Sequence, residues 1–171
     1  MTERKGITKA GGSPLTLVGP ELKVGDRAPD FMLAANDMKP VSLKDYAGRT
    51  LVLLGVPSLD TPVCDMETRR FNKEAAALSD KIAVLTISMD LPFAQKRWCA
   101  AAGIDRVRTL SDYRGAEFAR SYGVFIKELY LLARSAFVVD RAGVIRYTEI
   151  TPNVEDEPDY AGIIEAARAA L

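Results

Sequence analysis

Residues 51–64 constrain the fold of this chain more than any other stretch. Residues 51–56 read Leu-Val-Leu-Leu-Gly-Val, a short apolar run that predicts a buried strand, and Pro57 ends it. A helix start follows, because Thr61 is a residue type typical of helix N-caps and Pro62 suits the first helical position. A buried strand followed at once by a helix indicates the β–α unit of an α/β fold.

Cys64 is the third residue of this predicted helix. In a capping box, the same position carries an acidic side chain that reaches back to the cap. A thiolate there meets the free backbone N–H groups of the first turn and the positive end of the helix dipole. Because such surroundings favour the ionised sulfur, the sequence predicts a reactive thiolate at the rim of a sheet. The alternative for a single cysteine is a small buried hydrophobe, and the Thr61–Cys64 spacing argues against it.

The cysteine and histidine counts limit the chemistry that this thiolate could serve. The chain has two cysteines, Cys64 and Cys99, and no histidine. A Cys–His hydrolase is excluded because its base is missing, and a zinc site of the usual kind would need further ligands. The cysteines are not spaced as Cys-x-x-Cys, which disfavours a standard dithiol oxidoreductase. Whatever activates Cys64 must therefore be backbone dipoles, hydroxyls, arginine or lysine.

Length, charge and hydropathy indicate one globular domain over residues 1–171. Hydrophobic residues make up 48% of the chain and charged residues 27%, which argues against disorder. Lysine plus arginine and aspartate plus glutamate number 23 each, so no basic field points to nucleic acid or an anionic membrane. The apolar runs are too short to cross a bilayer, and no secretory signal is visible at the start. We therefore expect a cytoplasmic protein, in which cysteine pairs tend to be redox-active or metal-binding.

The other elements predict a mixed sheet flanked by helices. Residues 1–27 form an extension whose two short strands, at 7–10 and 15–18, make a hairpin around a Gly-Gly turn. Strands early in the domain should be parallel and the last ones antiparallel, which is the order of a thioredoxin-like fold. The later elements are a helical turn at 42–46, a helix at 62–78, a strand at 82–89, a helix at 92–102, a strand at 107–110, a helix at 114–121, a hairpin with strands at 136–140 and 144–148, and a helix at 158–171.

The two cysteines should lie at the same edge of the sheet but on different helices. Cys64 falls in the first turn of its helix, whereas Cys99 falls about seven residues into the next, or roughly 10 Å along it. A disulfide needs Cα atoms within about 7 Å, so we expect the thiols to stay apart unless a helix unwinds. Taken alone, Cys99 could equally be a plain core thiol.

Arg134 is the candidate cation for Cys64. It stands in the apolar run Leu-Leu-Ala-Arg-Ser-Ala at 131–136, where an arginine is more often snorkelling or paired for structure than catalytic. The absence of histidine favours the functional interpretation, because the thiolate needs a positive neighbour.

These segments resemble a known family. Residues 57–64, Pro-Ser-Leu-Asp-Thr-Pro-Val-Cys, with Arg-Arg-Phe-Asn at 69–72, are similar to the peroxidatic-cysteine signature of the peroxiredoxins. More narrowly, they resemble the bacterial thiol peroxidase branch, the atypical two-cysteine peroxiredoxins. The chain departs from that branch at Pro62, which a first helical turn tolerates, and at Trp98, whose bulk bears on unwinding. Further matches to the branch are the resolving-cysteine segment at 90–99, Ala-Pro-Asp-Phe at 28–31, Ala-Arg-Ser-Ala at 133–136 and the hairpin at 7–18.

The resemblance implies a thioredoxin-like α/β fold with an N-terminal β-hairpin extension, and it assigns roles to residues. Cys64 would attack hydrogen peroxide or an organic hydroperoxide and become a sulfenic acid. Cys99 would then condense with it to an intramolecular disulfide. Thr61 would orient the thiolate and the peroxide, and Arg134 would stabilise the thiolate and the leaving oxygen. Pro57 would shield the sulfur from water.

The resemblance also implies partners. A thioredoxin-like reductant would reduce the disulfide, the chain would form a homodimer, and no metal, haem or flavin would be needed. Two alternatives stay open from the residues alone. One is a thiol–disulfide exchange enzyme, which the lack of Cys-x-x-Cys disfavours, and the other is a redox-sensing domain whose binding surface changes when the cysteines are oxidised.

Overall fold

Strand β5 (Thr50–Gly55) lies inside a seven-stranded sheet, as its uniformly apolar sequence predicts. The computed structural model describes all 171 residues, and the strand order is β11-β10-β5-β6-β7-β3-β4. The three strands β5, β6 and β7 run parallel, and the strands on either side of them are antiparallel to their neighbours. The other strands of this sheet are β3 (Met32–Ala34), β4 (Pro40–Ser42), β6 (Ile82–Ser88), β7 (Val107–Ser111), β10 (Ser135–Val139) and β11 (Ile145–Ile150).

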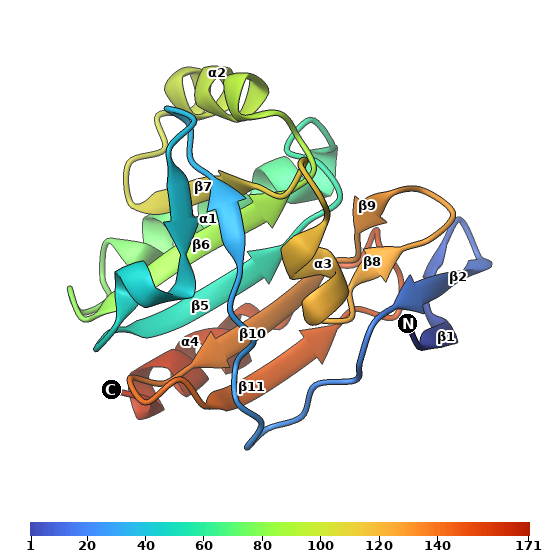
Figure 1. Ribbon diagram of the computed structural model, residues 1–171. Coiled ribbons are helices and arrows are strands. Elements are labelled where there is room, and N and C mark those ends of the chain that lie inside the picture. Colours follow the sequence, from blue (N-terminus) through green and yellow to red (C-terminus); the bar gives the residue numbers. More distant parts are fainter.

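The sheet separates two hydrophobic cores. Alternate residues of β5 face opposite sides, so Leu51 and Leu53 join the larger core while Val52 and Leu54 join the smaller one. Helices α1 (Pro62–Ala75) and α4 (Tyr160–Ala169) cover the smaller core and lie behind the sheet in Figure 1. On the other face lies α3 (Glu117–Ser121), whose Phe118 ring stacks on Tyr122 at 4.2 Å between centroids. The result is the predicted sheet flanked by helices.

Helix α2 (Pro92–Ala102) lies at the top of the molecule in Figure 1, against β7. It ends at Gly103, which adopts a left-handed conformation with φ 66° that glycine tolerates best. Its Trp98 packs in a small third cluster with Val56, Leu59 and Cys64. This cluster joins the start of α1 to the middle of α2, so the two cysteine-bearing helices meet at this end of the sheet.

The N-terminal hairpin packs on the main body of the molecule. Its strands β1 (Glu3–Ala10) and β2 (Ser13–Val18) form a second, four-stranded sheet with β8 (Phe125–Ile126) and β9 (Leu131–Leu132). Leu15 and Leu17 of β2 are buried in the larger core. The predicted hairpin is therefore present, with a first strand that begins earlier than expected.

Several predicted boundaries were wrong. The helix expected at 62–78 ends at Ala75, because its last turn tightens: the Ala77 N–H donates to the Glu74 carbonyl at 3.0 Å rather than to a residue four positions back. Met66, expected on the apolar stripe of this helix, is 46% exposed. The helix expected at 114–121 starts only at Glu117, and the last helix spans Tyr160–Ala169 rather than 158–171.

Four short strands escaped prediction, namely β3, β4, β8 and β9. Each has only two or three residues, which is too short to show an alternating pattern. The predicted helical turn at 42–46 is present as a 3-10 helix, η1 (Leu43–Tyr46). None of the four α-helices has both the length and the hydropathy needed to span a bilayer.

Candidate active site

Cys64 lies in the first turn of α1, directly after the loop that leaves β5. The structure buries it completely, and Val56, Leu59 and Trp98 pack around it. Pro57 is buried in the same loop. The sulfur is therefore at the predicted end of the sheet, in a position shielded from bulk water.

Arg134 reaches the sulfur from the neighbouring strand. Ser135 of β10 pairs with Gly55 of β5, so the residue before β10 comes to lie beside the start of α1. The Nη2 group of Arg134 donates to the Cys64 Sγ at 3.2 Å, and its Nε donates to the backbone carbonyl of Val154 at 3.0 Å. Arg134 is only 2% exposed. The two interpretations of Arg134 are therefore both correct: the side chain is paired within the fold, and it also contacts the Cys64 sulfur.

Glu67 is the site residue that the sequence interpretation missed. It lies three positions after Cys64 on the same face of α1, is fully buried, and forms an ion pair with the Nη1 group of Arg134. Its other carboxylate oxygen, Oε1, has no hydrogen-bond partner. The signal was available in the sequence as Cys-x-x-Glu, at residues 64–67 of the predicted helix.

The ionisation of this pair is set by burial and by mutual charge. Burial raises the pKa of Glu67 to about 7, against the opposing effect of the Arg134 charge. For Arg134, burial acts to lower the pKa, but the charges of Glu67 and Cys64 outweigh it and raise the pKa. Arg134 is therefore a permanent positive charge in contact with the sulfur.

Thr61 occupies the N-cap position of α1, but its side chain does not cap the helix. Its hydroxyl instead donates to the backbone carbonyl of Ser58 at 2.7 Å, within the loop. The predicted N-cap position of Thr61 is therefore confirmed, but its hydroxyl makes no capping hydrogen bond. Because the hydroxyl turns away, it leaves the first-turn N–H groups of α1 without a side-chain partner.

Cys99 lies in a different environment, in the third turn of α2. It is half-buried, and its Sγ lies 3.3 Å from the hydroxyl of Thr109 on β7, which in turn donates to Asn36 at 3.0 Å. Both cysteines are free thiols. The structure therefore brings Cys64, Arg134 and Thr61 into one region. Cys99 packs against the cluster that contains Cys64, but its sulfur has a separate polar partner in Thr109.

Comparison with known proteins identifies the family. The redoxin family model matches residues 23–164, which is most of the chain. The chain belongs to the redoxin family. The thiol peroxidase of Bacillus subtilis is 54% identical to it over 96% of this chain and 98% of its own length. That of Halalkalibacterium halodurans is 53% identical over 94% of this chain and 96% of its own length, so this redoxin falls in the thiol peroxidase branch of the peroxiredoxins.

Solved structures confirm the predicted fold of this redoxin. A peroxiredoxin-like protein from Aquifex aeolicus superposes with a TM-score of 0.91 at 37% identity, and the match covers all of both chains. A thiol peroxidase from Chromobacterium violaceum gives a TM-score of 0.84 over 95% of each chain, at 22% identity, which supports the fold alone. The thioredoxin-like sheet with an N-terminal hairpin is thus the architecture of this redoxin.

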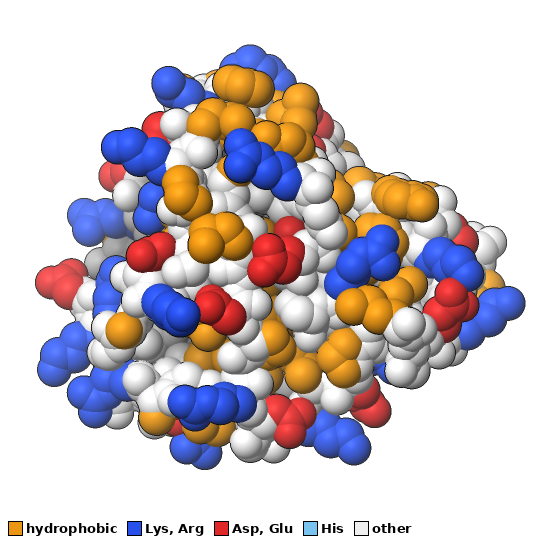
Figure 2. Space-filling model, viewed as in Figure 1, with side chains coloured by type: hydrophobic (Ala, Val, Ile, Leu, Met, Phe, Trp, Pro, Cys, Tyr) orange, Lys and Arg blue, Asp and Glu red, His pale blue; other side chains and the backbone are white.

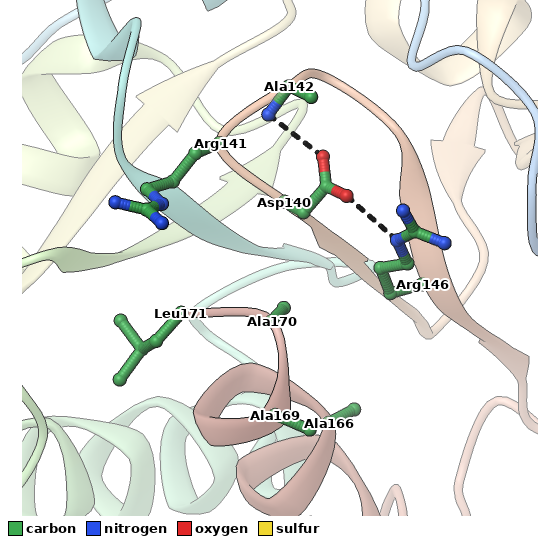
Figure 3. A pocket seen from close by; sticks show the side chains of 8 residues that line it. All are labelled: Asp140, Arg141, Ala142, Arg146, Ala166, Ala169, Ala170 and Leu171. Atoms are coloured by element: carbon green, nitrogen blue, oxygen red, sulfur yellow. Dashed lines mark hydrogen bonds and ion pairs between the residues drawn. The ribbon is translucent and has the colours of Figure 1, made fainter.

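This redoxin also has a hollow of about 520 Å³ far from the cysteines. Figure 3 shows it between the β10–β11 turn and the C-terminal end of α4, with Ala166 in the helix and Leu171 just after it. In the turn, the Nε of Arg146 donates to the Oδ2 of Asp140 at 2.7 Å. Arg134 precedes β10 and Asp140 follows it, which separates the hollow from the sulfur by roughly 20 Å of extended chain. No group of three or more Cys, Asp or Glu side chains is arranged to hold a metal ion.

Proposed function

We propose that this thiol-dependent peroxidase reduces hydrogen peroxide and organic hydroperoxides at Cys64. The observation that carries the proposal is the contact between the buried Cys64 sulfur and Arg134, 3.2 Å apart at a helix start. A fixed cation and unpaired helix N–H groups both favour a thiolate over a thiol. No histidine is present to do the same task.

The first step is attack of the Cys64 thiolate on the terminal oxygen of the hydroperoxide, the one that carries the hydrogen atom. An S–O bond forms, the O–O bond breaks, and the leaving alkoxide or hydroxide takes up a proton to become alcohol or water. Negative charge moves from sulfur to the leaving oxygen, and Arg134 with the first-turn N–H groups stabilises it there. The Thr61 hydroxyl donates its hydrogen to the Ser58 carbonyl, so its oxygen orients the peroxide as an acceptor, and Pro57 keeps water from the sulfur.

The second step is resolution by Cys99. Its thiolate attacks the sulfenic acid, an S–S bond forms, and the S–OH oxygen leaves as hydroxide that is protonated to water. A thioredoxin-like dithiol then reduces the disulfide and is itself oxidised to a disulfide. This cycle needs no metal, haem or flavin, and it needs a reducing compartment, which supports the cytoplasm.

We also infer a homodimer. Figure 2 shows hydrophobic side chains gathered over the top of the molecule, where α2 lies. Leu91 and Phe93, at the start of α2, are 50% and 65% exposed, which supports a contact surface next to the active-site loop. Sedimentation velocity of the wild type and of Phe93→Glu measures the assembly directly.

Peroxide consumption with a thioredoxin and thioredoxin reductase system tests the proposed function. Cys64→Ser should abolish turnover, because no other thiolate contacts Arg134. Cys99→Ser should still consume about one equivalent of peroxide per chain and then stop, because the sulfenic acid is formed but not resolved. A redox-sensing domain would instead show a single oxidation in the wild type without turnover. Unchanged consumption by Cys64→Ser would refute the proposal.

A further inference from the structure

One carboxylate ties the helix of Cys64 to the helix of Cys99. Asp65 follows Cys64 in the chain, and its Oδ1 accepts a hydrogen bond of 2.9 Å from the indole Nε1 of Trp98, which precedes Cys99. Its Oδ2 accepts from Arg69 at 2.9 Å. The Arg69 guanidinium also lies over the Trp98 ring, 5.7 Å from the centroid. The residues next to the two cysteines are therefore directly bonded to each other.

The two sulfurs, in contrast, have different partners. Cys64 faces Arg134, and Cys99 faces Thr109 on β7. A disulfide requires their Cα atoms within about 7 Å and the side chains pointing together, so both sulfurs must leave these partners, and we expect α1 or α2 to open locally. Asp65 and Trp98 are the covalent neighbours of the two cysteines. Such an opening therefore strains or breaks the hydrogen bond between Asp65 and Trp98.

Other contacts between these segments are less affected by such an opening. Asp90 accepts from the Ser58 hydroxyl at 2.7 Å and from the Leu59 N–H at 2.8 Å, but all three residues lie outside both helices. The pair between Asp60 and Arg97 spans 4.0 Å with both side chains more than half exposed, where water screens it. Trp98, by comparison, is 8% exposed, so its indole N–H finds few alternative partners in place.

We propose that Asp65 and Trp98 are positioning residues that hold the reduced arrangement and slow the resolution of oxidised Cys64 by Cys99. This inference rests on the proposed peroxidase cycle. The sulfenic acid has two outcomes: condensation with the Cys99 thiol gives the disulfide and water, and reaction with a second hydroperoxide gives the sulfinic acid and an alcohol or water. The Asp65–Trp98 bond lengthens the time for which the second outcome competes with the first.

Trp98→Phe removes the N–H donor and keeps an aromatic ring in the cluster, but it also empties part of the space that the indole filled. The Asp65 variants described below therefore serve as its control, because they break the same hydrogen bond without changing the Trp98 ring. After one addition of peroxide, acid quenching and intact-protein mass spectrometry separate the sulfenic, disulfide and sulfinic forms. We expect disulfide formation about three- to tenfold faster than in the wild type, in line with the usual net contribution of one hydrogen bond whose acceptor is partly exposed. The rate of sulfenic acid formation should stay unchanged, and the sulfinic fraction should fall at equal peroxide.

A double-mutant cycle separates this role from general loosening. Asp65→Ala should accelerate resolution as Trp98→Phe does, and the double variant should be no faster than either single variant. Asp65→Asn retains an acceptor for the indole and should stay closer to the wild type. Additive acceleration, or resolution at the wild-type rate in both single variants, would overturn the inference. If the wild type itself forms no Cys64–Cys99 disulfide, the proposed cycle fails, and this inference fails with it.

Discussion

Cys64 and Cys99 each lie on the helix that follows a parallel strand, yet the structure gives them opposite surroundings. Cys64 is in the first turn, fully buried and bonded to a cation. Cys99 is in the third turn, half-buried and next to the neutral hydroxyl of Thr109. Cys64 has both the position at a helix start and the charged neighbour, and Cys99 has neither.

Removing Arg134 should have the largest effect on this contrast, because it takes from Cys64 the cation that Cys99 lacks. Arg134→Met should lower the second-order rate of Cys64 oxidation by roughly 10²–10³-fold, the usual loss for one charge-stabilising donor. It should also lower the free energy of unfolding by about 3–5 kcal/mol, because Glu67 is left buried without its partner. Stopped-flow competition with a reference peroxidase measures the rate, and urea melts measure the stability.

A matched double variant separates the two effects of Arg134. In Arg134→Met with Glu67→Leu, no charge is stranded, so much of the stability should return. The oxidation rate of Cys64 should stay low, since no cation contacts the sulfur. Recovery of the rate along with the stability would show that Arg134 only supports the fold and that the contrast between the thiols has another origin.

Glu67 makes the Cys64 side of the molecule sensitive to pH. Burial raises its pKa in the fold to about 7, above the ordinary glutamate value of 4.5, so the fold binds this proton more tightly than the unfolded chain does. Its contribution to stability is therefore complete below about pH 4.5 and is lost as pH rises through 7. The loss is at most about 3 kcal/mol, from the size of the shift.

Glu67→Gln, which keeps the shape and stays neutral, is the comparison for this effect. The difference in unfolding free energy between wild type and Glu67→Gln should change between pH 4.5 and 7.5, with the wild type losing more as pH rises. Thermal or urea melts of both proteins across this range measure it. A difference that is constant with pH, or that moves the other way, would mean that the Arg134 charge holds Glu67 ionised throughout.

The two cysteine sites also differ in how far the sequence revealed them. The apolar run before Pro57 and the helix-start residues after it placed Cys64 at the end of β5, and that position is local in the chain. Arg134 lies next to Cys64 because β10 pairs with β5, and the sequence alone does not determine the alignment of these two distant strands. The Asp65–Trp98 bond likewise joins residues 33 positions apart. The turn of the Thr61 hydroxyl toward Ser58 was missed because helix-cap preference is only a local tendency, which the loop overrides here.

The smallest expected effect concerns the Cys99 side of the comparison. Thr109→Val removes the hydroxyl next to the Cys99 sulfur and keeps the shape of the side chain, at a cost of about 1 kcal/mol because the bond to Asn36 is also lost. In a Cys64→Ser background only Cys99 can be alkylated, and its rate with iodoacetamide should rise by up to about threefold, since the thiol is no longer held against β7. The same substitution should leave the oxidation rate of Cys64 unchanged in an otherwise wild-type chain. An unchanged or slower alkylation of Cys99 would mean that packing in α2, rather than the Thr109 hydroxyl, keeps this thiol turned away, and resolution would then depend on opening of the helix alone.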